Sequence, residues 1–170
     1  MEFLEKDLEQ VIYEADRDLL FEKGLGISGK LYRQKNLGGY GIADLISVKR
    51  CAHPYGSYLR VTIYELKQQK IGIAAFLQAI GYAKAIQHYF NKRGFLQYSL
   101  NIALIGKELD MTGTFCFLPD LLCNVSDYER FGTIDSVSFY TYKYELNGIS
   151  FTDHSGYYNK FHNFKLKGNG

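Results

Sequence analysis

Gly41-Ile-Ala-Asp-Leu-Ile46 and Ile63-Tyr-Glu-Leu-Lys67 decide how this chain of 170 residues folds. Around each stretch every second residue is apolar over most of one face, which is the pattern of a half-buried β-strand. We therefore expect strands over residues 40–50 and 58–67. The segment between them, Cys51-Ala-His-Pro-Tyr-Gly-Ser57, contains the turn formers Pro and Gly, so the two strands are expected to pair as a hairpin.

The register of this hairpin brings two carboxylates together. If the turn is centred between Pro54 and Tyr55, Asp44 lies opposite Glu65. Directly opposed side chains have Cβ atoms roughly 4.5–5.5 Å apart, so the two charges repel each other unless a cation lies between them. Lys67 shares the face of Glu65, but one ammonium cannot neutralise two carboxylates. Oxygen ligands in this arrangement suit Mg²⁺ or Mn²⁺. A surface salt bridge of the pair with Lys67 is the alternative.

These two carboxylates lie in a segment of the chain that is otherwise basic. The chain carries 20 basic and 18 acidic residues, yet residues 30–93 hold eleven basic residues and two acidic ones, Asp44 and Glu65. A basic segment of this kind attracts phosphates without reading bases, whereas each lysine taken singly is better read as solvated surface. The positive field is assigned to Lys30, Arg33, Lys35, Lys49, Arg50, Lys70, Lys84, Lys92 and Arg93.

Hydrophobic spacing predicts further elements on both sides of the hairpin. Apolar residues at helical spacing predict one helix over 2–20 and a second over 73–91. Strands are expected over 98–105 and 137–146, and Asn147-Gly148 predicts a tight turn into another short strand. Residues 113–132 fit no element clearly. We see no linker or repeat, and expect one α/β or α+β domain over residues 1–170.

The pattern resembles the PD-(D/E)XK nuclease superfamily, whose fold is restriction-endonuclease-like. That core is αβββαβ, with a mixed central sheet flanked by helices, an Asp on one hairpin strand and Glu-x-Lys on the next. Here these are Asp44 and Glu65-Leu-Lys67. Gln78-Ala-Ile-Gly-Tyr82 resembles the QxxxY motif of the RecB-like branch. The resemblance covers about residues 2–105, and it leaves a C-terminal extension over about 106–170 that contains the second hairpin.

The resemblance implies a site and a reaction. Asp44, Glu65 and the backbone carbonyl of Leu66 would hold Mg²⁺ or Mn²⁺, helped by Glu5 on the first helix. Lys67 would orient or activate a water for attack on the phosphate and offset the charge that develops there. Further residues fall into two groups, namely the catalytic candidates Gln78 and Glu9, the latter an alternative to Glu5, and the nucleic-acid contacts Lys30, Arg33, Gln34, Lys35, Lys70, Tyr82 and Lys84.

Three functions follow from these observations. The first is a Mg²⁺-dependent endonuclease acting on DNA rather than RNA, whose specificity comes from a homodimer, a protein partner or DNA shape. The second is a catalytically inactive nucleic-acid-binding module of the same fold. The third is a small α+β interaction protein whose match is coincidental. Ala43 stands where the family name has Pro, and the C-terminal third matches no part of the family.

Several classes are excluded by composition. Three cysteines without CxxC spacing and four scattered histidines predict neither a disulfide framework nor a zinc site. No apolar run is long enough to span a bilayer, and the acidic N-terminus lacks the core of a signal peptide. We therefore expect a cytoplasmic protein that does not contact membranes.

Overall fold

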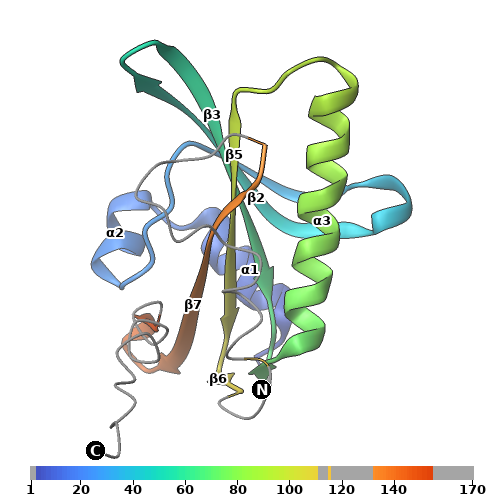
Figure 1. Cartoon of the computed structure of the whole chain (residues 1–170). Helices are drawn as coiled ribbons and strands as arrows, with labels where there is room; N and C mark the ends of the chain where they lie inside the picture. The colour runs from blue at the N-terminus through green and yellow to red at the C-terminus, as the bar shows by residue number, and fades with distance from the viewer. Residues whose placement is uncertain (1–2, 111–114, 116–131, 155–170) are drawn as a thin grey trace, which may run out of the picture.

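A computed structural model of the chain describes residues 3–110, 115 and 132–154 (Figure 1). In chain order the elements are α1 (Glu5–Glu14), α2 (Arg17–Glu22), β1 (Lys30–Asn36), the 3₁₀ turn η1 (Gly38–Tyr40), β2 (Ile42–His53), β3 (Gly56–Leu66), β4 (Lys70–Ile71), α3 (Ile73–Lys92), β5 (Tyr98–Gly106), β6 (Glu108–Leu109), β7 (Ile134–Glu145) and β8 (Gly148–Asp153).

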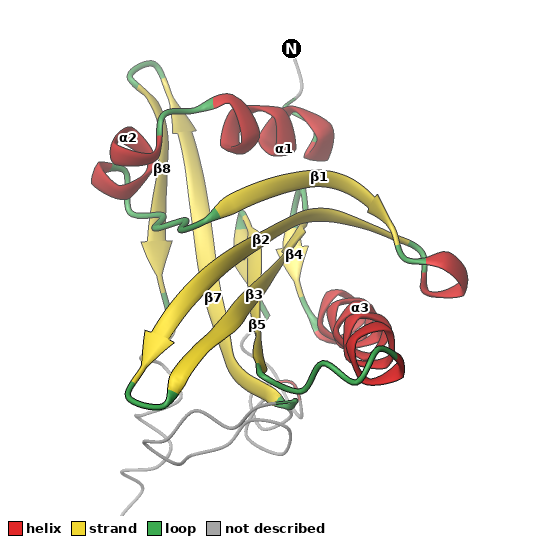
Figure 2. Cartoon of the chain, turned by 90° about the horizontal axis from the view of Figure 1, so that it is seen from above, coloured by secondary structure: helices red, strands yellow, loops and turns green. Residues whose placement is uncertain are grey.

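The fold is α+β, built on a mixed six-stranded sheet in the order β1-β2-β3-β5-β7-β8. The β3–β5 and β5–β7 pairs are parallel, and the others are antiparallel. Figure 2 shows α1 and α2 on one side of the sheet and α3 on the other. Strands β4 and β6 form a separate parallel pair next to the start of α3.

Each face of the sheet carries its own hydrophobic core. The core under α3 includes Ile46, Val61, Ile63, Phe76, Tyr82 and Leu104. The core under α1 and α2 includes Leu8, Ile12, Leu20, Leu45, Leu66 and Tyr142. Successive residues of β2 and β3 point to opposite faces, and therefore one hairpin supplies the centre of both cores.

The predicted hairpin register is confirmed. The Cα pairs run from Leu45↔Tyr64 to His53↔Gly56, so that Pro54 and Tyr55 form the turn. Asp44 and Glu65 occupy the next positions beyond the last pair. The structure lengthens the predicted strands toward the turn, because the two backbones stay paired up to His53.

The single helix expected over 2–20 is wrong. The chain leaves the helix after Glu14, and Asp16 caps a new one by accepting hydrogen bonds from the backbone N–H groups of Asp18 and Leu19. Such an N-cap begins a helix with its own direction. In consequence Leu20 is buried, whereas its neighbour Leu19 is 48% exposed.

Strand β1 was not predicted. Its residues are mostly exposed and polar, and Leu31 is buried alone, so the alternation that marks a strand is missing. It lies at the edge of the sheet, where only one side is paired. Gln34 interrupts it with φ +49°, the left-handed region, and is the one residue other than glycine with positive φ in the described ranges.

The remaining predictions agree with the structure where it describes them. The helix expected over 73–91 is α3, the strand over 98–105 is β5, and Asn147 lies in the turn between β7 and β8. Residues 116–131 and the tail beyond 154 lie outside the described residues. Within the described part of the chain, no helix has the length and apolar character needed to cross a membrane.

Candidate active site

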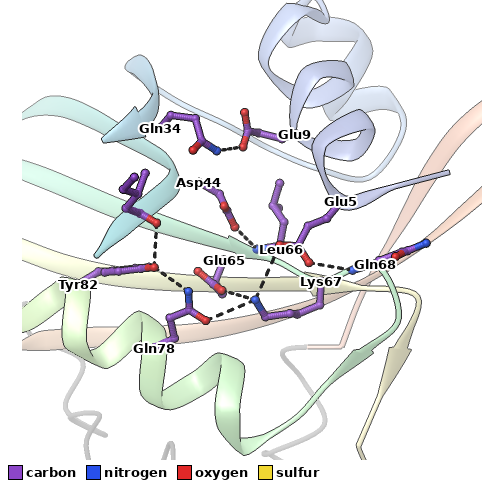
Figure 3. A network of polar contacts seen from close by, with 11 residues as sticks. Glu5, Glu9, Gln34, Asp44, Glu65, Leu66, Lys67, Gln68, Gln78 and Tyr82 are labelled. Atoms are coloured by element: carbon purple, nitrogen blue, oxygen red, sulfur yellow. Dashed lines mark hydrogen bonds and ion pairs between the residues drawn. The ribbon is translucent and has the colours of Figure 1, made fainter. Parts of the chain in front are cut away.

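The site forms where the β2–β3 pairing ends. Asp44 Oδ2 accepts a hydrogen bond of 3.0 Å from the backbone N–H of Leu66, just past the last Cα pair of the hairpin. Lys67 Nζ donates to Glu65 Oε1 at 2.6 Å. Figure 3 shows Asp44, Glu65 and Lys67 converging between the hairpin and α3. The predicted juxtaposition of the two carboxylates is therefore present.

Glu65 is the most buried of the site carboxylates, with 1% of its surface exposed. Its oxygen Oε2 is buried and has no hydrogen-bond partner among the residues that the structure describes. A buried carboxylate oxygen left in this state is costly, and a bound cation would satisfy it. This orphaned oxygen beside Asp44 fits a hard divalent ion such as Mg²⁺ or Mn²⁺.

The electrostatics point the same way. Burial raises the pKa of Asp44 to about 6, although the Leu66 hydrogen bond opposes the shift. Burial likewise raises the pKa of Glu65 to about 7, against the opposing hydrogen bond from Lys67 and with help from the charge of Asp44. Two adjacent carboxyl groups with raised pKa values mark a candidate functional site, and a divalent cation would favour their ionised forms.

Lys67 stays protonated in this setting. Burial lowers the pKa of Lys67, but the hydrogen bond to Glu65 and the charges of the surrounding carboxylates outweigh it, so the net shift is upward. The backbone N–H of Lys67 also donates to Ile105 at 2.8 Å, which fixes the residue to β5. The side chain is thus a fixed cation rather than a base at neutral pH.

Gln78 and Tyr82 lie one turn apart on α3 and connect it to β2. Gln78 Oε1 is 3.5 Å from Lys67 Nζ, and Gln78 Nε2 donates to the Tyr82 hydroxyl at 2.7 Å. That hydroxyl donates to the Ile42 carbonyl at 2.8 Å. Tyr82 is buried, and a Cβ at Gly41 would lie 3.4 Å from its ring. The pair therefore positions Lys67 relative to the strand that carries Asp44.

The two glutamates of α1 have different surroundings. Glu5 Oε2 accepts from the backbone N–H of Gln68 at 3.3 Å, and Glu5 Oε1 is 4.0 Å from Lys67 Nζ. Glu9 is buried and bonded to Arg33 Nε and Gln34 Nε2. The structure therefore brings Glu5 to the site. Glu9, the alternative to Glu5, instead binds two side chains of β1.

The predicted nucleic-acid contacts do not form one cluster. Arg33 and Gln34 are bonded to Glu9, and Tyr82 is buried. The lysines are spread over three places: Lys30 and Lys35 lie against the Tyr32 ring, Lys70 pairs with Asp110, and Lys84 donates to Gln87. The basic segment thus includes structural cations as well as exposed ones.

Tyr142 is a site residue that sequence reasoning missed. Its hydroxyl donates to the carbonyl of Gln68 at 2.9 Å, while Glu5 accepts the N–H of the same residue. The segment after Lys67 is thereby held from β7 and from α1. No spacing rule connects residues 74 positions apart, and the buried Tyr142 resembles any other core aromatic in the sequence.

The chain's own donors set the coordination available to a metal. In the described ranges, no group of three or more His, Cys, Asp or Glu side chains is arranged to hold an ion. Asp44 and Glu65 could supply two donors, and the carbonyl of Leu66, which lies between Glu65 and Lys67 in sequence, could supply a third.

Comparison of the chain with models of protein families, with curated proteins and with solved structures finds no match.

Proposed function

We propose that the chain is a divalent-metal-dependent nuclease with a restriction-endonuclease-like core, which hydrolyses phosphodiester bonds of DNA. One observation carries the proposal. The Oε2 atom of Glu65, beside Asp44 and Lys67, is buried and has no hydrogen-bond partner among the described residues. The comparison with an αβββαβ core is supported by the elements α1, β1, β2, β3, α3 and β5 in that order, with β5 parallel to β3. The short elements α2, η1 and β4 are inserted among them.

Asp44, Glu65 and the Leu66 carbonyl would hold Mg²⁺ or Mn²⁺, with Glu5 nearby. The ion would polarise the scissile phosphate and lower the pKa of a bound water. Lys67 contributes a fixed positive charge for the oxygens of the phosphate, where negative charge develops during hydrolysis. Because its pKa is raised, Lys67 acts here as a cation and hydrogen-bond donor rather than as a proton acceptor.

The remaining side chains position this lysine. Gln78 approaches the ammonium from α3, and Tyr82 fixes Gln78 to the β2 backbone at Ile42. On the opposite side Glu5 holds Gln68. The ammonium thus has partners from two elements packed on opposite faces of the sheet, which limits its movement when a phosphate arrives.

The test is cleavage of labelled DNA with Mg²⁺, with Mn²⁺ and with EDTA. We expect cleavage that requires the metal and falls at least about a hundredfold in Glu65→Gln. The matched control is Glu22→Gln, which changes an exposed glutamate on α2 and should leave the rate unchanged. DNA that is retarded on a gel but never cleaved with either metal would instead indicate an inactive binding module.

A further inference from the structure

A groove with an apolar lining opens beside the site. Its volume is about 440 Å³, its floor includes Ile46 and Val48, and its far wall includes Tyr89 on α3. Ile46 is the next residue after Asp44 on the same face of β2. Along α3, Tyr89 follows Gln78 and Tyr82 toward the C-terminal end of the helix. The groove and the site therefore lie between the same two elements.

Beside this groove the edge strand β1 carries an aromatic ring and two cations, none of which is among the residues that line it. Tyr32 pairs with Ile46 and Lys30 pairs with Val48, so these β1 side chains share the face that forms the floor. Lys30 Nζ lies 5.2 Å and Lys35 Nζ 5.0 Å from the centre of the Tyr32 ring. One half-buried ring with two exposed ammonium groups therefore borders the floor.

A second aromatic–cation pair stands on the opposite wall. The guanidinium carbon of Arg93 lies 3.7 Å from the centre of the Tyr89 ring, and Tyr89 is 52% exposed. At this distance the guanidinium is seated on the ring. Two rings with three cations thus flank an apolar floor.

Resting on the proposed nuclease function, we propose that this groove receives an unpaired nucleic-acid strand and leads it to Asp44 and Glu65. Unpaired bases offer apolar π-faces to Tyr32, Tyr89 and the floor, while Lys30, Lys35 and Arg93 neutralise the phosphates. A duplex keeps its bases stacked inside and presents mainly phosphate and sugar to such a floor. The chemistry of the groove therefore selects single strands.

The test measures binding without metal, so that it does not depend on cleavage. Fluorescence anisotropy in EDTA compares an oligothymidylate, an oligouridylate and a blunt duplex of equal length. We expect tighter binding of a single strand than of the duplex, and about tenfold weaker single-strand binding in Tyr89→Ala. Tyr89→Phe keeps the ring and should keep the affinity. Tyr55→Ala is the matched control, because this tyrosine is 93% exposed at the hairpin turn and outside the groove.

The two single-stranded probes distinguish DNA from RNA, and preference for either over the duplex supports the groove. Equal or tighter duplex binding, or unchanged affinity in Tyr89→Ala, would overturn it. Failure of the nuclease proposal is seen separately: single-strand binding that depends on Tyr89, without metal-dependent cleavage, keeps the groove and rejects the hydrolysis. Cleavage that depends on Glu65, together with binding that does not depend on Tyr89, keeps the hydrolysis and rejects the groove.

Discussion

Lys67 Nζ lies 2.6 Å from Glu65 Oε1, two residues earlier in the chain, and this contact satisfies one oxygen of a carboxylate that is 1% exposed. The second oxygen faces no hydrogen-bond donor in the part of the chain that is described. The Lys67 ammonium therefore neutralises and fixes one oxygen of the carboxylate, while the other oxygen remains without a partner and could bind a ligand.

The role of Lys67 can be tested separately from metal binding by substituting this residue. We expect Lys67→Ala to lower kcat for DNA cleavage by about 10²–10³, because one preorganised donor to the developing charge is lost. The acid limb of the pH–rate profile should move to higher pH, because Lys67 holds down the pKa of both Glu65 and Asp44. A rate profile measured in Mg²⁺ tests both points. Retention of the full rate in Lys67→Ala would contradict the assigned role.

Activity should fall on acidification through the raised pKa values of the two carboxyl groups. Asp44 has a pKa of about 6 and Glu65 of about 7. Below these values both are protonated and bind no metal, so kcat/KM should decline as the pH drops from about 7.5 to 5.5. Raising the Mg²⁺ concentration should move this decline to lower pH, because metal and protons compete. A decline indifferent to Mg²⁺ concentration would argue against these groups.

The same groups make the metal-free protein less stable toward neutral pH. An acid whose pKa is raised on folding binds more protons when folded, so between its usual pKa near 4 and its folded value the free energy of unfolding falls as the pH rises. Asp44→Asn should remove part of this slope and stabilise the metal-free chain by about 2 kcal/mol at pH 7.5. Urea unfolding in EDTA at several pH values measures this free energy. If it depended on pH in the same way in Asp44→Asn and in the unaltered protein, the expectation would be refuted.

Divalent ions should restore that stability. At a concentration about 100 times Kd, a ligand that binds only the folded state adds about 2.7 kcal/mol. Thermal unfolding at pH 7.5 should therefore show a higher Tm with Mn²⁺ or Mg²⁺ in the unaltered protein and little change in Glu65→Gln. An equal rise in both proteins would place the binding elsewhere.

Substitution of Glu9 should mainly lower stability, whereas substitution of Glu5 should mainly lower activity. Glu9→Gln removes the carboxylate that holds the Arg33 guanidinium, and should cost about 2–3 kcal/mol in the free energy of unfolding. Glu5 is partly exposed, so Glu5→Gln should cost less than about 1 kcal/mol yet slow cleavage by loosening the Lys67 segment. Unfolding curves and cleavage rates of the two variants give the comparison, and the reverse pattern would exchange their roles.

Much of the fold and the heart of the site could be predicted because they are local. A symmetric turn fixed the pairing that brings Asp44 beside Glu65, and helical spacing placed Gln78 and Tyr82 on one face. These relations span few residues and follow from the periods of strands and helices.

What could not be predicted depends on contacts between distant segments. Strand β1 has no alternating pattern, and therefore the sequence gives no sign of the bond from Arg33 to Glu9. The helix breaks at Asp16 because the side chain of this residue caps a new helix, and the continuous apolar stripe gives no sign of the break. The support of Gln68 by Tyr142 needs the parallel pairing of β5 with β7, which no local pattern specifies.

The two-residue turn at Pro54 and Tyr55 also determines which residues face each other at the open end of the hairpin, where Asp44 and Glu65 lie. Every pair from that turn inward is fixed by counting equal steps along β2 and β3. Inserting one residue into either strand would force a bulge or a slip, and a slip would turn one carboxylate to the opposite face. Adding one residue to each strand, so that the hairpin gains one pair, would lengthen the hairpin and leave Asp44 opposite Glu65. Related chains should therefore vary in hairpin length symmetrically.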